Sequence, residues 1–252
     1  MLNEERRQKI EQFLSKNKRL RVSSIANQLQ TSEVTIRKDL EVLERRGVLT
    51  RVHGGAIVNH STVTDLALTE KERIHIKQKQ RIAQKAAEMI SEGEVIILDS
   101  GSTTLQIARQ IKFYKNLTII TNAVNIASEL AASDMEIILT GGILREKSFS
   151  LVGPIAEEAM RNFTADKLFL GIDGIHFKHG LTTPNVLEAK INQLMVKAAG
   201  EVILVADSSK FGRRSLGFIA DISSLQKIIT DKEINPEDIN RLENMGIKVF
   251  TV

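Results

Sequence analysis

The feature that most restricts the fold of this 252-residue chain is an alternation of two patterns from residue 95 onward. Short apolar runs, typical of buried strands, alternate with segments whose apolar residues recur at helical spacing. The expected strands are 95–98, 117–120, 136–139, 167–170, 202–205, 227–229 and 248–252. The expected helices are 104–111, 124–132, 154–160, 186–199 and 236–245, after a longer helix at 70–90. Buried strands separated by helices predict an α/β fold with a parallel sheet covered on both faces.

Residues 31–49, TSEVTIRKDLEVLERRGVL, predict a short amphipathic helix. Ser32 is a good N-cap, and Gly47 is a stop signal. The apolar stripe consists of Ile36, Leu40 and Leu43. The opposite face and its flanks carry Val34, Thr35, Arg37, Lys38 and Arg45. Lys and Arg can reach guanine or phosphate, and Thr and Val methyls can contact the thymine methyl in a major groove. An ordinary surface helix with solvated charges fits these residues equally well, so the neighbouring segments must decide.

The neighbouring segments favour DNA binding. A first helix is expected at 4–16, a basic turn at 17–21, and a second helix capped by Ser23 or Ser24. The connection to the helix at 31–49 is very short, which predicts a helix-turn-helix. Two short apolar runs then flank a Gly-Gly turn and predict a β-hairpin, so the whole is a winged helix. Arg51 and His53 lie in this wing, near backbone phosphate or the minor groove. For His53, a plain polar turn residue is nearly as good an interpretation.

Charge is distributed unevenly along the chain. Residues 1–58 contain twelve Lys and Arg against seven Asp and Glu, whereas the remaining residues contain 23 and 24. A basic first quarter followed by a neutral remainder is typical of a small nucleic-acid-binding domain joined to a larger one. We therefore expect a winged helix-turn-helix domain at 1–58, a polar linker at 59–69 and a second domain at 70–252.

Composition excludes several classes of protein. The chain has no Cys, so disulfides and thiolate-bound metals are excluded, which fits a cytoplasmic location. Its five His residues are scattered without ligand spacing, and we expect neither a metal site nor a cofactor. No signal peptide is visible, and no apolar run is long enough to span a membrane.

A second site is expected where the strands of the parallel sheet end, because ligands of open α/β sheets bind there. Residues 98–104, LDSGSTT, place hydroxyls, a Gly and backbone N–H groups at a helix start, which favours an anion such as phosphate. A strand-to-helix turn with Ser and Thr caps is the weaker interpretation, because one cap needs a single hydroxyl.

Other strand ends carry further candidates. Asp173, in GIDG, can accept hydrogen bonds from sugar hydroxyls, although a turn-capping Asp is an equally good interpretation. Lys210, in DSSK, is placed to neutralise a phosphate, and Glu188 opens a helix. TNA at 121–123 and TGG at 140–142 end two more strands. Each candidate is weak alone, but all are expected at one edge of the sheet.

SEVTIRKDLEVLERRGVLTRVHGGAI resembles the DNA-binding domain of the DeoR/GlpR family of bacterial sugar-catabolism repressors. DSGSTT, TNA, LTGG, GIDGI, EAKIN and DSSKFG resemble the effector-binding domain of that family, which is similar in fold to ribose-5-phosphate isomerase. The resemblance covers almost the whole chain. It implies that Ser100, Gly101, Ser102, Thr103 and Thr104 hold the phosphate of an effector. It also implies that the sugar pocket is lined by Asp99, Asn122, Gly142, Asp173, Glu188 and Lys210.

Two functions follow. The first is a transcriptional regulator, a repressor of a sugar or amino-sugar catabolic operon that a phosphorylated sugar releases from double-stranded operator DNA. Two operator half-sites require a homo-oligomer, a dimer or a tetramer. DNA contact is then expected from Ser32, Val34, Thr35, Arg37, Lys38, Arg51 and His53. The alternative is a sugar-phosphate isomerase or deaminase with an accessory DNA-binding head, in which Asp173 or Glu188 is the general base. The head and the charge asymmetry favour the regulator, so we expect no catalytic residue.

Overall fold

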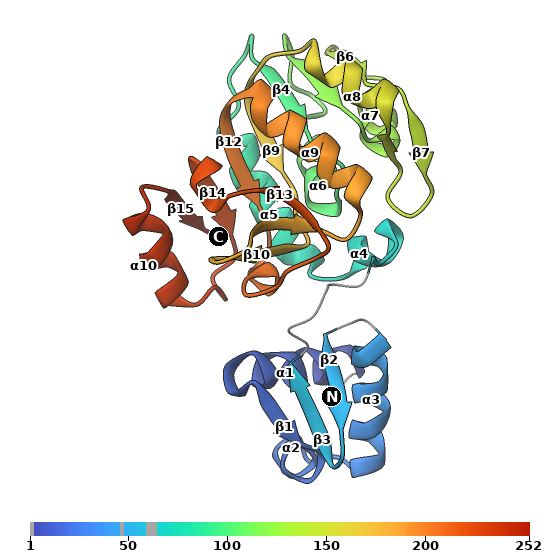
Figure 1. Cartoon of the computed structure of the whole chain (residues 1–252), viewed down its shortest axis with the longest axis vertical. Helices are drawn as coiled ribbons and strands as arrows, with labels where there is room; N and C mark the ends of the chain where they lie inside the picture. The colour runs from blue at the N-terminus through green and yellow to red at the C-terminus, as the bar shows by residue number, and fades with distance from the viewer. Residues whose placement is uncertain (1–2, 46–47, 59–64) are drawn as a thin grey trace. The chain divides into compact units, whose positions relative to one another are not determined.

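The computed structural model describes residues 3–45, 48–58 and 65–252. The chain divides into two compact units, Met1–Thr64 and Asp65–Val252, whose helices and strands are labelled in Figure 1. Residues 65–69, expected in the linker, therefore belong to the second unit, and 59–64 lie outside the described residues. Among the described residues, no helix is both long and apolar enough to cross a membrane.

The first unit is a winged helix-turn-helix. Its described elements are α1 (Asn3–Asn17), β1 (Arg19–Arg21), α2 (Val22–Gln28), α3 (Glu33–Arg45), β2 (Leu49–Val52) and β3 (Gly55–Val58). The strands form an antiparallel sheet in the order β1-β3-β2. Ile36, Leu40 and Leu43, the predicted stripe of α3, are fully buried in the core of the unit. The Ser32 hydroxyl accepts the backbone N–H of Thr35 at 3.1 Å, which confirms the predicted N-cap.

Two expectations for this unit were wrong. Residues 17–21 are not simply a turn, because Lys18 adopts φ 62° and Arg19–Arg21 then form β1. A three-residue strand with one buried side chain is too short for periodicity to reveal. Helix α2 begins at Val22, without a side-chain cap, rather than after Ser23 or Ser24. Its first N–H is instead bonded by the Gly54 carbonyl at 2.9 Å. The predicted stop at Gly47 lies outside the described residues.

The wing turn is His53–Gly54, and each glycine of the pair has its own requirement. Gly54 adopts φ 76°, a conformation that Gly reaches without steric cost. Gly55 lies in β3 against β1, and a Cβ there would come within 2.1 Å of the Leu20 carbonyl oxygen. The Gly-Gly pair therefore sets both the turn and the close approach of the two strands.

The second unit contains the predicted parallel sheet, with strand order β15-β14-β12-β9-β4-β5-β6. Every neighbouring pair in it is parallel. Its strands are β4 (Val95–Leu98), β5 (Thr118–Thr121), β6 (Glu136–Leu139), β9 (Ala165–Leu170), β12 (Ala199–Val205), β14 (Lys227–Thr230) and β15 (Lys248–Thr251). The helices on one face are α5 (Ile76–Ala87), α6 (Ser102–Ile111) and α7 (Val124–Leu130). Those on the other are α8 (Pro154–Arg161), α9 (Val186–Ala198) and α10 (Pro236–Asn244). The α/β expectation is confirmed.

The helix expected at 70–90 is interrupted. It forms α4 (Leu68–Arg73) and α5, separated by His75 in the left-handed region at φ 54°. Apolar spacing on either side remains helical, so the pattern cannot show one left-handed residue. Two small antiparallel sheets were also not expected. They are β7 (Ile143–Arg145) with β8 (Ser150–Val152), and β10 (Gly174–His176), β11 (Gly180–Thr183) and β13 (Gly217–Ala220).

The strand order reverses between β4 and β9. From β4 the chain proceeds through β5 to β6 in one direction, and from β9 it proceeds through β12 and β14 to β15 in the other. At such a reversal the connections leave on opposite sides, so a crevice opens at the carboxyl ends of the two strands. Asp99 follows β4 and Gly171 follows β9, and the Gly171 N–H donates to the Asp99 carboxylate at 3.0 Å.

Candidate functional site

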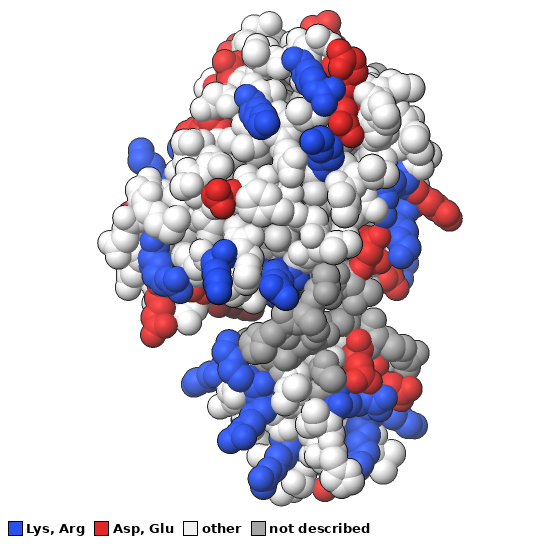
Figure 2. Space-filling view, in the orientation of Figure 1, with Lys and Arg blue, Asp and Glu red and all other residues white. Residues whose placement is uncertain are grey.

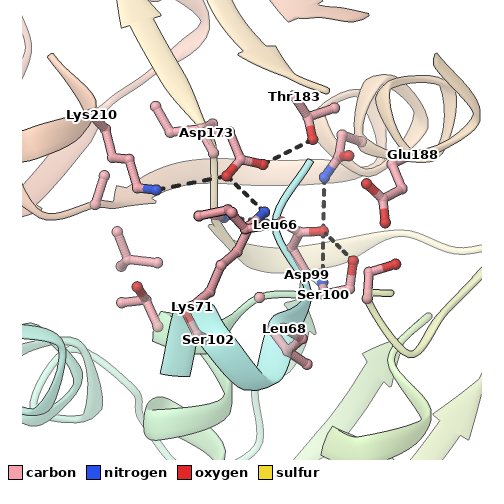
Figure 3. Close-up of a pocket in the computed structure, with 18 of the residues that line it drawn as sticks. Leu66, Leu68, Lys71, Asp99, Ser100, Ser102, Asp173, Thr183, Glu188 and Lys210 are labelled. Carbon is pink, nitrogen blue, oxygen red and sulfur yellow. Dashed lines mark hydrogen bonds and ion pairs between the residues drawn. The ribbon is translucent and has the colours of Figure 1, made fainter. Parts of the chain in front are cut away.

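A pocket opens in the second unit at this reversal, and Figure 3 shows it closely. Segments from both sides of the crevice line it, together with α4, α5 and α9. Its polar and charged lining residues are Lys71, Lys79, Asp99, Ser100, Ser102, Thr103, Lys147, Ser148, Asp173, Thr183, Glu188, Asn192 and Lys210. Five aliphatic residues also line it: Leu66, Leu68, Ile172, Val205 and Ala206. The mixture of cations, carboxylates and hydroxyls suits a small, polar, anionic ligand.

Asp173 is the centre of an ion-pair cluster on one side of the pocket. Its carboxylate lies 2.7 Å from Lys71 Nζ and 3.7 Å from Lys210 Nζ, and it accepts the Thr183 hydroxyl at 3.2 Å (Figure 3). Burial opposes ionisation, but the two cations prevail and lower the pKa of Asp173 to about 2. The same carboxylate raises the pKa of Lys71 against the effect of its burial. This side of the pocket is therefore charged at every physiological pH.

Asp99 has a different environment. Its carboxylate accepts the Ser100 N–H at 2.7 Å, the Asn192 amide at 2.8 Å and the Gly171 N–H. Burial raises the pKa of Asp99 to about 7; the Asn192 hydrogen bond opposes this shift, and nearby Glu188 adds to it. Asp99 therefore orders the two strand ends and presents a carboxyl group that titrates near neutrality.

Lys79 is a buried cation at the same pocket. Its side chain is 3% exposed, and its ammonium donates to the backbone carbonyls of Lys71 and Ile74, which end α4. It forms no ion pair with any residue that the structure describes. Burial lowers the pKa of Lys79 to about 8; the nearby Asp207 and Asp173 carboxylates oppose this shift, and the Lys210 and Lys71 cations add to it. An anion bound beside it would relieve this unfavourable charge.

The loop from Ser100 to Thr103 begins α6. Gly101 is the N-cap, and no side chain caps the helix. The Ser102 and Thr103 hydroxyls are almost buried, line the pocket and have no hydrogen-bond partner among the residues the structure describes. Backbone N–H groups at a helix start carry partial positive charge, so this loop can bind an anion.

Three of the predicted pocket residues do not line it. The Thr104 hydroxyl donates to the Gly101 carbonyl at 3.0 Å and is fully buried. Asn122 exchanges hydrogen bonds with the Leu151 backbone. Gly142 adopts φ 121° and lies so close to β8 that a Cβ would meet the Val152 carbonyl oxygen at 2.7 Å. Since β5 and β6 lie beyond β4, their ends are on the far side of the reversal from β9.

The structure brings Asp99, Ser100, Gly101, Ser102, Thr103, Asp173, Glu188 and Lys210 together, as predicted. It adds residues that sequence reasoning did not find, above all Lys71 and Lys79. Both lie in the interval for which the sequence predicts one continuous helix, eight positions apart. Two lysines on a helix are ordinary in sequence, and only the break at His75 and the packing of α4 and α5 bring them to the pocket.

The candidate DNA-contacting residues lie on α3 and in the wing. Val34 is 64% exposed, and Arg37 and Lys38 are exposed on the same helix. Arg37 pairs with Glu33 at 3.0 Å on this surface. Ser32 is exposed and caps α3, and its hydroxyl lies 2.8 Å from that of Thr35.

In the wing, His53 is an exposed turn residue. Arg51 pairs with Glu44 at 2.5 Å and donates its backbone N–H to the same carboxylate at 2.8 Å. The backbone and side-chain hydrogen bonds from Arg51 lower the pKa of Glu44. Arg51 would have to exchange this partner to contact phosphate.

Asp39 fixes α3 to α1. Its carboxylate is 1% exposed and accepts Arg6 Nε at 2.5 Å and Arg7 Nε at 2.9 Å. Figure 2 shows other Lys and Arg side chains spread over the visible face of the first unit. The unit thus combines a rigidly anchored helix with a cationic surface, which is what binding to nucleic acid requires.

Comparison with known proteins agrees with both units. A family model described as a DeoR-like helix-turn-helix domain matches residues 6–62, and a DeoR C terminal sensor domain matches residues 74–232. HTH-type transcriptional regulator GlpR of Haloferax volcanii is 39% identical over 249 residues, which are 99% of this chain and 98% of that protein. Transcriptional repressor AccR of Agrobacterium fabrum is 34% identical over 230 residues, 90% of this chain and 89% of that protein.

The lactose phosphotransferase system repressor of Streptococcus mutans is 33% identical over 235 residues, 92% of this chain and 93% of that protein. Among solved structures, a D-ribose-5-phosphate isomerase in complex with phospho-erythronic acid aligns with 54% of each chain, at 15% identity and a TM-score of 0.41. That likeness is partial, and the α/β assignment rests on the sheet described above.

Proposed function

This chain belongs to the DeoR family of transcriptional regulators, and we propose that it represses a sugar-catabolic operon until a phosphorylated sugar binds its second unit. The first unit binds operator DNA through α3 and the wing. The effector occupies the pocket at the reversal between β4 and β9. Since operators of this kind present two half-sites, the acting species is a homo-oligomer, and it works in the cytoplasm.

The observation that carries the effector assignment is that a buried cation and a helix start line the same pocket. Lys79 lacks a carboxylate partner among the described residues, and Ser102 and Thr103 offer hydroxyls without partners. A phosphate monoester supplies the missing negative charge and accepts from all three groups. On the other sides of the pocket, Asp99 and Glu188 can accept hydrogen bonds from sugar hydroxyls.

Relatives support the same assignment. The Streptococcus mutans protein is named a repressor of a lactose phosphotransferase system, and the three relatives described above are named regulators or repressors. The chain is accordingly a regulator rather than an enzyme. We propose that the effector of this chain is a sugar phosphate, and the experiment below identifies the sugar.

The test measures ligand binding and operator release on the same protein. Thermal melting is recorded with glucose 6-phosphate, fructose 6-phosphate, glucosamine 6-phosphate and ribose 5-phosphate, and with each unphosphorylated sugar. Binding to the folded state alone adds about 2.7 kcal/mol of stability at a hundredfold excess over Kd. A phosphorylated sugar should raise Tm and weaken operator binding, whereas its unphosphorylated parent should do neither.

The variant Ser102→Ala/Thr103→Ala removes the two hydroxyls at the start of α6 and keeps the backbone turn. It should bind operator normally and should not respond to the phosphosugar. Ser223→Ala/Ser224→Ala, in the short 3-10 helix Ile222–Ser224, is the matched control and should respond as the wild type does. If the pocket variant responds at the wild-type concentration, the phosphate binds elsewhere.

A further inference from the structure

Residues 65–73, here called the strap, form part of the wall of the pocket. The strap includes α4, and its Leu66, Leu68 and Lys71 side chains line the cavity (Figure 3). The Leu68 N–H donates to the Lys147 carbonyl at 2.7 Å, and Lys71 pairs with Asp173. In sequence the strap follows directly on the first unit, which ends at Thr64. A ligand in this pocket therefore meets the segment of chain that leads to the DNA-binding unit.

Arg145, at the end of β7, connects the strap with the pocket wall. One guanidinium nitrogen lies 2.7 Å from the Glu188 carboxylate, and the other lies 2.9 Å from the Asp65 carboxylate. The Arg145 side chain is 15% exposed. Although burial opposes it, Glu188 and Asp65 raise the pKa of Arg145, so the bridge is permanently charged.

The two carboxylates have different places in the fold. Glu188 lines the pocket, whereas neither Arg145 nor Asp65 does. Glu188 also accepts the Ser150 hydroxyl at 2.8 Å, on the oxygen that faces Arg145. A sugar hydroxyl that donates to Glu188 competes with Arg145 for the same carboxylate and weakens the ion pair between them. Because Arg145 also pairs with Asp65, this change is transmitted to the start of the strap.

We propose that Arg145 is a positioning residue that couples occupancy of the pocket to the strap, and through it to the DNA-binding unit. This inference rests on the proposed function of the pocket. In the empty protein, Arg145 and Lys71 hold the strap at its two ends, on Asp65 and Asp173. A phosphosugar competes for both anchors, since its phosphate attracts Lys71 and its hydroxyls engage Glu188. The strap then binds less tightly to the pocket wall in the liganded state, which supplies the differential affinity that coupling requires.

The planar guanidinium is essential to this role, because its two terminal nitrogens serve two different carboxylates, whereas an ammonium is a single point charge. Arg145→Gln removes the charge, and Arg145→Lys keeps it but cannot reproduce the fork. Asp65→Asn weakens the same bridge from the strap side. Arg161→Gln is the matched control, because Arg161 pairs with Glu157 and Glu158 on the surface of α8.

The experiment uses the full chain and has two parts. The first needs no effector: hydrogen exchange is followed in residues 65–73 of the free protein. Arg145→Gln and Asp65→Asn should speed exchange of these amides, and Arg161→Gln should leave it unchanged. Unchanged exchange in the first two variants overturns the inference, whatever the phosphosugars do.

The second part measures operator Kd with and without an equimolar mixture of glucose 6-phosphate, fructose 6-phosphate and glucosamine 6-phosphate. In wild type the mixture should weaken operator binding within the range of about 5- to 150-fold that is usual for coupled sites. In Arg145→Gln, the ratio of the operator Kd with the mixture to the operator Kd without it should fall below about twofold, while the mixture still raises Tm. Asp65→Asn should act alike, and the double variant should add nothing further, because both remove one interaction.

The outcomes separate this inference from the proposed function. If wild type gives no Tm shift and no release, the proposed function fails, and the inference fails with it. If wild type responds and Arg145→Gln responds equally, only the coupling role is overturned. If Arg145→Gln loses the Tm shift, Arg145 serves ligand binding rather than coupling, which also overturns the inference.

Discussion

The buried cation of Lys79 makes the proposed effector binding dependent on pH in a defined window. In the free protein, the pKa of Lys79 is lowered from its ordinary value of 10.5 to about 8. At about 1.4 kcal/mol per pKa unit, the charged form costs the free protein about 3 kcal/mol. A bound phosphate dianion offsets this cost, so the pKa of Lys79 rises in the complex.

The sign of the effect follows from proton linkage. Below pH 8, Lys79 is protonated both in the free protein and in the complex, so the affinity for the phosphosugar does not depend on its titration. Above pH 8 the free protein loses the proton that the complex keeps, so binding must take one up. With a pKa of about 8, affinity should fall about eightfold between pH 7.5 and 9. A phosphomonoester, with its second pKa near 6, stays a dianion throughout, and Asp99, with a pKa of about 7, titrates mostly below this window.

Titration calorimetry across this window provides the assay, and buffers of different ionisation enthalpy count the proton taken up. Lys79→Gln should bind the phosphosugar more weakly and with no dependence on pH from 7.5 to 9. Lys190→Gln, an exposed lysine of α9 outside the pocket, should retain the wild-type profile. A flat profile in wild type, or the same slope in Lys79→Gln, refutes the reasoning.

Three further predictions concern other parts of the chain. Arg37→Ala or Lys38→Ala should weaken operator binding by about 1 to 3 kcal/mol where the side chain reads a base. Unchanged affinity in both, measured by fluorescence anisotropy, would contradict the role of α3. Asp39→Asn should lower the free energy of unfolding in urea by about 3 kcal/mol, because two α1 arginines lose their buried carboxylate; a loss below about 1 kcal/mol would count against this anchor. Gly142→Ala should lower Tm but leave phosphosugar affinity intact, since a Cβ meets a β8 carbonyl. Lost affinity with unchanged melting would return Gly142 to the pocket.

Local patterns were enough to predict the architecture. Ile36, Leu40 and Leu43 recur at helical spacing, and that spacing alone places them on one buried face. The apolar runs of the second unit likewise predicted the seven strands of its sheet, with ends shifted by a few residues. Such patterns work because helix and strand periodicity are properties of neighbouring residues, and burial of one face is required in every fold that contains them.

The sequence did not predict the elements that have no periodic pattern. Strand β1 has three residues, and His75 breaks a helix by a single backbone conformation. Asp39 appeared in sequence as one charge among many on α3. Its burial depends on Arg6 and Arg7, which lie more than thirty residues away.

The pocket shows most clearly what the sequence determined and what tertiary structure decided. The rule that ligands of such sheets bind at the carboxyl edge proposed Ser102 and Asp173, and both line the pocket. The same rule also proposed Asn122, which lies on the other side of β4. Only the strand order, with β9 beside β4, selects which ends meet. The position of Lys79 in the pocket also depends on tertiary structure, because it is set by how α4 and α5 pack. Packing between distant segments leaves no periodic pattern in the sequence.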